Sequence, residues 1–279
     1  MKRPGHARPL PADNERAGWA WALARILLPT FGVRSYDRAV SRSSRPYERI
    51  LGAVFGVFWL VLAIAPNDRA TWWLENALSI AAVAALVGFH RRLLFSRVSY
   101  TLIFVFLCLH QIGAHYTYAQ VPYDRWCELL TGHPFNRLVG WERNNFDRVV
   151  HFAYGLLIAY PIREIFLRVA DVRGFWGYFL PLDLTMSTSM IFELLEWLAA
   201  IIFGQGVGQA YLGTQGDVWD AHKDMALASG GALLAMFITA LINWRFQRDF
   251  AREWSESLRV KHAAPLGEDE VKRMLRKRK

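Results

Sequence analysis

Long runs of apolar residues alternate with short charged segments between residues 50 and 245. Most of these runs approach the ~20 residues that a helix needs to cross the hydrocarbon core of a bilayer. Because backbone groups in lipid must be hydrogen-bonded within the segment, the runs predict transmembrane helices. The pattern predicts six of them, at residues 50–65, 71–89, 98–119, 147–169, 179–203 and 217–244. Residues 120–146 are expected to form a polar, aromatic-rich loop.

The segments on either side of this region are polar and basic. Residues 1–49 begin Pro-rich and lack the apolar run and cleavage site of a signal peptide. Within this arm, residues 18–31 are apolar but short and carry a central Arg25, which favours a helix lying on the membrane surface. The expected organisation is a basic arm over 1–49, a transmembrane domain over 50–245 and a basic tail over 246–279.

The distribution of Lys and Arg predicts the orientation of the spans. When the connecting segments are assigned alternately to two sides, 27 of the 33 Lys and Arg residues fall on the side of both termini. Basic residues favour the cytoplasmic side. We therefore expect an all-α, polytopic bundle of about six transmembrane helices, with both termini cytoplasmic.

The composition agrees with a membrane protein and excludes some other classes. Hydrophobic residues make up 53% of the chain, and its 12 Trp residues are of the type enriched at membrane interfaces. The net charge of +9 comes from basic residues that flank apolar runs, so the expected partners are the bilayer and its anionic lipid headgroups, not nucleic acid. Two cysteines without a paired spacing indicate neither a disulfide framework nor a thiolate metal site.

Carboxylates occur within, or at the ends of, the last two predicted spans. Glu193 and Glu196 are three residues apart and share one face of a helix. Asp217, Asp220 and Asp224 recur at spacings of three and four, which predicts that they share one face of the next helix. An ionisable group at membrane depth costs at least ~2.5 kcal/mol and is by default a functional hypothesis.

Histidines and cations accompany these acids. His151 follows Asp147 by four residues in the fourth predicted span, and Arg148 and Lys223 lie beside acidic positions. His110 lies in the third span. On the predicted topology the intramembrane acids and histidines fall in the outer half of the bilayer or near its midplane, although only Lys and Arg entered that topology. The sequence therefore predicts one polar cavity that opens outward.

The predicted cluster contains more carboxylates than cations. Six acids cannot all stay ionised beside two or three cations unless a metal ion or shared protons compensate them. An oxygen-rich site with imidazole suits Mn, Fe, Zn or Mg. The candidate catalytic acids are Glu193, Glu196, Asp220 and Asp224. The candidate metal ligands are His151, Glu196, Asp220 and Asp224. The residues expected to support them are Asp147, Arg148, Asp217, Lys223 and His110.

Four sequence motifs are distinctive. They are YDRW (123–126), FDRVVHFAYG (146–155), FELLEW (192–197) and GTQGDVWDAHKDM (213–225). On these motifs the chain, over roughly residues 50–245, resembles the YjdF-type bacterial inner-membrane proteins, a domain of unknown function. The resemblance implies a multi-spanning inner-membrane protein without an established activity. The layout of DxxxH, then Glu, then spaced Asp before glycine is also similar to the VanZ-like proteins, which are associated with glycopeptide resistance, but this chain has paired acids where those carry other polar residues.

Three functions stay open at this point. The first is a metal-binding hydrolase or transferase that acts on an envelope or lipid-linked substrate. The second is a proton- or cation-coupled transporter, although no inverted repeat is visible and the cytoplasmic half of the spans looks dry. The third is a non-catalytic membrane module, in which the acids cap helices and pair with Arg148 and Lys223. The metal, the substrate and whether the protein is an enzyme are not decided by the sequence.

Overall fold

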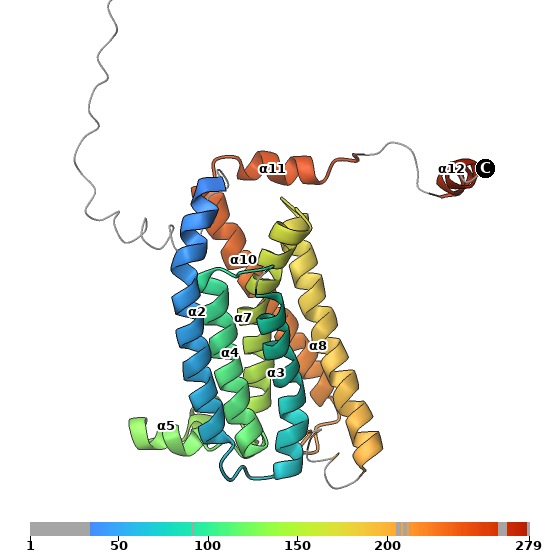
Figure 1. Cartoon of the computed structure of the whole chain (residues 1–279). Coiled ribbons are helices and arrows are strands. Elements are labelled where there is room, and N and C mark those ends of the chain that lie inside the picture. The colour runs from blue at the N-terminus through green and yellow to red at the C-terminus, as the bar shows by residue number, and fades with distance from the viewer. Residues whose placement is uncertain are drawn as a thin grey trace, which may run out of the picture. The chain divides into compact units, whose positions relative to one another are not determined.

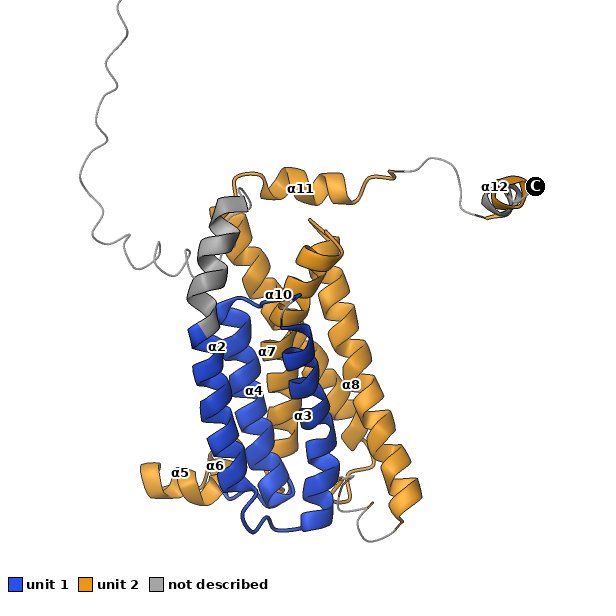
Figure 2. Cartoon of the chain, viewed as in Figure 1, with its two compact units in different colours: residues 1–122 blue, residues 123–279 orange. Residues whose placement is uncertain are grey.

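The computed structural model of the chain is helical throughout its described part (Figure 1). It describes residues 34–90, 92–204, 208, 211, 213–261 and 267–277, with the side chains of 34–45 and 268–272 left out. The helix expected at residues 18–31 lies outside the described residues. The chain divides into two compact units, residues 1–122 and 123–279, and each is described by itself (Figure 2).

The described part of unit 1, from residue 34 onward, contains three long helices. They are α2 (Arg34–Leu62), α3 (Arg69–Phe89) and α4 (Arg97–Tyr116). The Asp68 side chain accepts the amide hydrogen of Thr71 and caps the N-terminus of α3, and Ser96 caps α4 in the same way. Thr117 and Tyr118 both have positive φ, which ends α4 at Tyr116, three residues before the end of the predicted span.

Helices α2 and α4 run side by side in the same direction. The Tyr47 hydroxyl and Thr101 Oγ1 are 2.6 Å apart near the start of α4. At the other end, His115 Nδ1 lies 2.7 Å from the carbonyl oxygen of Leu62. Residues 47–62 of α2 therefore accompany α4 over almost its whole length.

Unit 1 buries a polar group of side chains between its helices. Asn76 is fully buried and accepts a hydrogen bond from the indole of Trp59 at 2.6 Å. His110 is buried too, with Nε2 at 3.2 Å from the Glu75 carbonyl oxygen and Nδ1 in contact with the Tyr118 hydroxyl. The contacts of His110 thus lie within unit 1, whereas the acids with which the sequence grouped it belong to unit 2.

The residues that the structure describes in unit 2 form three long helices with shorter ones at both ends. The long helices are α7 (Phe146–Val169), α8 (Trp176–Phe203) and α10 (Asp220–Phe246). The shorter ones are α5 (Tyr123–Thr131), α6 (Phe135–Val139), α11 (Phe250–Ser257) and α12 (Glu268–Lys277). The expectation of a loop over residues 120–146 is wrong, because α5 and α6 form there.

Contacts along α7 show how the long helices of unit 2 run. His151 lies beside Glu193 of α8, whereas Arg163, three turns later, lies over the ring of Tyr178. Helix α8 is therefore antiparallel to α7. Helix α10 is parallel to α7, because their first turns meet through the Asp220 region and their later turns continue in contact.

Two glycines let α7 and α10 approach closely. A Cβ added at Gly155 would lie 1.9 Å from the carbonyl oxygen of Ala228, and one at Gly231 would lie 2.2 Å from that of Phe152. Ala232, beside this contact, is fully buried. Small residues that bring two backbones together are typical of helix pairs in membranes.

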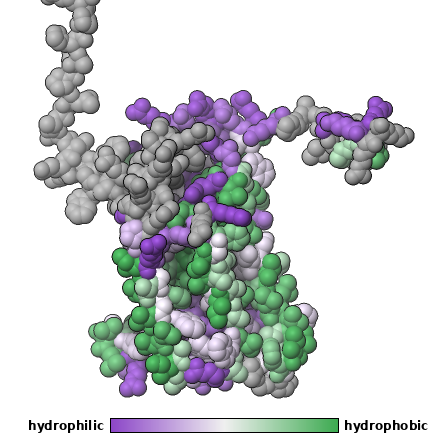
Figure 3. All heavy atoms as spheres, in the orientation of Figure 1, coloured by the Kyte–Doolittle hydropathy of each residue, from purple (hydrophilic) through white to green (hydrophobic). Residues whose placement is uncertain are grey.

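Five helices are long and apolar enough to cross a membrane among the described residues. They are α3, α4, α7, α8 and α10. The sequence predicts all five, and it also predicts a sixth span at residues 50–65, which is not among them. That segment forms the second half of α2, whose apolar part is short and follows a charged first half. On the face shown in Figure 3, hydrophobic residues cover the long helices and hydrophilic residues gather over α11.

Candidate functional site

The acidic residues of unit 2 converge where α7 and α10 begin. Asp147 and His151, four residues apart, lie on one face of the first turns of α7. Asp220 and Asp224, also four apart, lie on the buried face of the first turns of α10. Glu193 reaches the same place from the second half of α8. All five side chains belong to unit 2.

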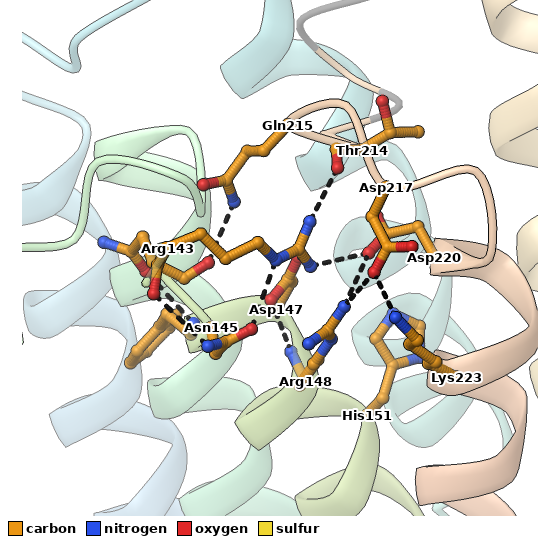
Figure 4. Close-up of polar contacts among 12 residues, drawn as sticks. Arg143, Asn145, Asp147, Arg148, His151, Thr214, Gln215, Asp217, Asp220 and Lys223 are labelled. Atoms are coloured by element: carbon orange, nitrogen blue, oxygen red, sulfur yellow. Dashed lines mark hydrogen bonds and ion pairs between the residues drawn. The ribbon is translucent and has the colours of Figure 1, made fainter. Parts of the chain in front are cut away.

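Arg143 links the two acids nearest the starts of α7 and α10, Asp147 and Asp220. Its guanidinium donates to Asp147 at 3.0 Å, to Asp220 at 2.6 Å and to the Thr214 carbonyl oxygen at 2.6 Å (Figure 4). Its Nε donates to Asn145 at 3.1 Å. One arginine therefore joins the start of α7, the start of α10 and the turn before α10.

A second set of ion pairs lies at the exposed edge of the cluster. Arg148 and Lys223 both donate to Asp217, at 2.5 and 2.6 Å (Figure 4). The hydrogen bond from Lys223, with a second from the Trp219 amide, lowers the pKa of Asp217 to about 2. Asp217 lies in the turn before α10, not on the helix as the sequence predicted; its side chain accepts the Trp219 amide hydrogen, a local contact that favours a turn over a helix.

Within the described ranges, no Lys or Arg forms an ion pair with the deeper acids of the cluster, Glu193 and Asp224. Asp224 is 4% exposed and Glu193 is 7% exposed. Glu193 Oε1 lies 3.5 Å from His151 Nε2. Neither this oxygen nor Asp224 Oδ1 has a hydrogen-bond partner among the described residues. Since buried polar atoms are normally satisfied, these two oxygens point to a missing partner.

Two groups of side chains have the geometry of a metal site. One group is His151, Glu193 and Asp224; the other is Asp147, Asp220 and Asp224. In each group, one potential ligand atom per residue lies within 4.8 Å of the others. The second group is already occupied by guanidinium, because Arg143 binds both Asp147 and Asp220. The first group offers one imidazole and two carboxylates, a donor set that suits Zn²⁺, Mn²⁺ or Fe²⁺.

The structure places the residues predicted from the sequence at different positions in the cluster. Glu196 lies beside Glu193 one turn further along α8 but belongs to neither ligand group among the described residues. Lys223 forms an ion pair with Asp217 at the exposed edge of the cluster. Sequence reasoning missed the central place of Arg143, although its spacing of four from Asp147 was a signal. It also missed Glu75, a buried acid within α3 of unit 1.

Comparison with known proteins gives the family. A family model described as "Predicted membrane protein (DUF2238)" matches residues 47–245. The inner membrane protein YjdF of Escherichia coli (strain K12) is 37% identical over 188 residues, which cover 67% of this chain and 86% of the relative. The chain belongs to the DUF2238 family. No solved structure matches it.

Membership of the DUF2238 family agrees with the five candidate spans, and the chain is a multi-pass protein of the inner membrane. Its apolar helices contact the lipid bilayer. The matched region includes α7, α8 and almost all of α10, and so contains every residue of the acidic cluster. The family name carries no activity, so the function has to be argued from the cluster itself.

Proposed function

We propose that unit 2 binds a divalent metal ion between α7, α8 and α10, with His151, Glu193 and Asp224 as ligands. The observation that carries this proposal is the pair of buried carboxylate oxygens without partners, on Asp224 and Glu193. Both belong to one ligand group of suitable dimensions, and that group includes the imidazole of His151.

The distribution of charge supports this assignment. The three acids nearest the starts of α7 and α10 all have basic partners. These acids are Asp147, Asp217 and Asp220, and their partners are Arg143, Arg148 and Lys223. Three cations therefore face three carboxylates, and no Lys or Arg among the described residues forms an ion pair with Glu193 or Asp224. An uncompensated buried carboxylate costs several kcal/mol. A divalent ion would neutralise the two remaining negative charges.

A metal ion held this way would act as a Lewis acid and could lower the pKa of a bound water. The arginines beside the site would favour an anionic substrate. This chemistry fits a hydrolase or transferase that acts on an envelope or lipid-linked substrate at the membrane surface. The roles that the sequence gave to Glu196 and Asp220 then become secondary ones, near the metal but not bound to it.

Metal binding by the purified, detergent-solubilised protein tests the proposal. The protein is stripped with a chelator and titrated with Mn²⁺, Zn²⁺, Fe²⁺ and Mg²⁺ while metal content and Tm are measured. An ion at 100 times its Kd should stabilise the fold by ~2.7 kcal/mol. At ~2–4 °C per kcal/mol, Tm should rise by roughly 5–11 °C.

Asp224→Asn distinguishes metal binding from a structural role. Removing an uncompensated buried charge should leave the metal-free variant at least as stable as the metal-free wild type, while the rise in Tm with metal disappears. Glu142→Gln, an exposed change of the same charge near the start of α7, is the matched control and should keep that rise. A metal-free Asp224→Asn protein that is clearly less stable than wild type, with no metal bound by either, would refute the proposal.

The second candidate, a proton- or cation-coupled transporter, is favoured by one observation. The buried face of α8 carries Thr185, Ser189 and Glu193 at helical spacing, and Ser189 Oγ has no hydrogen-bond partner among the described residues. Polar positions therefore continue from the acidic cluster toward the other half of unit 2, which the sequence analysis expected to be dry. Hydroxyls in such a row are able to relay protons or coordinate a cation.

We further propose that α2 is the sixth span and that both termini are cytoplasmic. The supporting observation is its pairing with α4 at both ends, through Tyr47 and Leu62. If α4 crosses the membrane, residues 47–62 accompany it over about 22 Å at 1.5 Å per residue. Green fluorescent protein and alkaline phosphatase fused in turn to each terminus test this: only the fluorescent fusions should be active. An active phosphatase at either end would overturn the topology.

A further inference from the structure

A buried arginine lies at the end of unit 2 away from the acidic cluster. Arg163 is in the second half of α7 and is only 8% exposed. It follows His151 by twelve residues, which is roughly 18 Å along the helix. It is therefore separate from the proposed metal site, and an arginine inside a membrane span is itself a functional hypothesis.

The contacts of Arg163 do not balance its charge. Its Cζ lies 4.6 Å from the centroid of the Tyr178 ring, and Asn243 holds that ring by donating to the Tyr178 hydroxyl at 2.7 Å. Its Nε has no hydrogen-bond partner, and the guanidinium forms no ion pair, within the part of the chain that the structure describes. A cation–π contact offsets only part of the cost of burying a guanidinium.

Three exposed arginines at this end differ from Arg163 in having acidic partners. Arg168 pairs with Glu164 at 2.7 Å. Arg173 pairs with Asp171 and Arg252 pairs with Asp249, each at 3.1 Å. The chain thus supplies carboxylates to cations that water already solvates, and supplies none among the described residues to the one that is buried. An anion from outside the chain would complete the site.

The surroundings of Arg163 are those of a membrane surface. Helix α11 docks on the start of α8, where Ser257 accepts hydrogen bonds from the Phe175 amide and the Trp176 indole, both at 2.9 Å. Trp254 packs against Tyr178. Tryptophans at helix ends are typical of the headgroup level of a bilayer. The hydrophilic surface over α11 agrees with this placement (Figure 3).

We propose that Arg163 binds the phosphate of an anionic lipid headgroup at the α11 end of unit 2. A guanidinium presents a planar fork of donors that matches two phosphate oxygens, and it is more weakly hydrated than an ammonium. The ring of Tyr178, which Asn243 holds, packs against the guanidinium of Arg163 and fixes its position. Arg163 is thus a recognition residue for lipid, independent of the metal site.

Native mass spectrometry of the full-length, detergent-solubilised protein tests this proposal. Phosphatidylglycerol, phosphatidylcholine and inorganic phosphate are titrated separately. Wild type should retain phosphatidylglycerol at least tenfold more tightly than phosphatidylcholine, and Arg163→Gln should lose about that factor. Arg173→Gln, the same change at an exposed and paired arginine, should keep wild-type affinity. Arg163→Lys keeps the charge but not the fork, and should lie between them.

Three results would overturn the assignment. The first is the absence of a preference for phosphatidylglycerol in the wild-type protein. This result does not depend on whether any variant folds. The second is an equal loss of affinity in Arg163→Gln and Arg173→Gln, which would indicate general surface charge. The third is displacement of phosphatidylglycerol by millimolar inorganic phosphate, which would assign the site to the free anion instead of a lipid.

Discussion

Replacing Gly231 with alanine tests whether the close contact of α7 and α10 sets the geometry of the cluster. The new Cβ would lie 2.2 Å from the Phe152 carbonyl oxygen and 2.8 Å from the Leu156 amide nitrogen, where ordinary contact begins at 3.4 Å. Because backbone atoms of a helix cannot turn aside, the two helices must separate locally by about 1 Å. Overpacking of this kind costs ~1–3 kcal/mol, or roughly 2–12 °C in Tm.

The same separation should weaken metal binding. His151 directly precedes Phe152 on α7, and Asp224 precedes Gly231 by about two turns on α10, so a shift of the helices also moves these ligands apart. Ligand sets tolerate displacements of ~0.5 Å. We therefore expect Gly231→Ala to bind metal at least ~10-fold more weakly than wild type, measured by the same titration.

Gly230→Ala is the matched control for this change. A Cβ at Gly230 would meet no atom within 4 Å, so the substitution adds the same methyl group without a clash. Alanine in a helix interior is favoured over glycine by roughly 0.5–1 kcal/mol, so this variant should be as stable as wild type or slightly more so. If both variants showed the same Tm and the same metal affinity, the close contact would have no part in shaping the site.

Two further predictions concern the ion pairs. The lowered pKa of Asp217 means that its ion pairs stabilise the fold above its ordinary pKa of 3.8 and are lost as pH falls toward 2. The difference in Tm between wild type and Asp217→Asn should therefore shrink as the pH is lowered from 3.8 toward 2. Arg143→Gln should leave Asp147 and Asp220 without their shared cation and cost roughly 3 kcal/mol, seen as a lower Tm; Arg143→Lys should recover only part of it, because one ammonium cannot serve the same fork-shaped set of acceptors.

The spans were predictable because the membrane imposes a simple rule. A spanning helix must be apolar for most of its length, so hydropathy alone placed α3, α4, α7, α8 and α10 within three residues at each end. The largest differences depend on local backbone conformation. Positive φ at Thr117 ends α4 early, and the turn at Asp217 delays the start of α10; neither effect has a hydropathy signature.

The acidic cluster was only partly predictable because pairing depends on tertiary structure. Spacing placed Asp147 with His151, and Asp220 with Asp224, since neighbours on one helix face follow from its period. It could not show that Arg143 folds back across both helices, or that Glu193 meets His151 while Glu196 joins neither ligand group. Those contacts form only when α7, α8 and α10 pack together in the folded protein.

Helix α8 carries buried polar residues between the acidic cluster and the end of unit 2 where Arg163 lies. The contact of α7 with α10 is made of small apolar residues, so a proton or cation that moved inward from Glu193 would have to follow Ser189 and Thr185 on α8. Ser189→Ala separates the two candidate functions, because Ser189 belongs to neither ligand group. If the protein is a metal enzyme, this variant should bind metal as wild type does. If it is a transporter, the variant should lose proton flux into liposomes, measured with an enclosed pH-sensitive dye, and a wild-type protein without such flux would exclude proton transport.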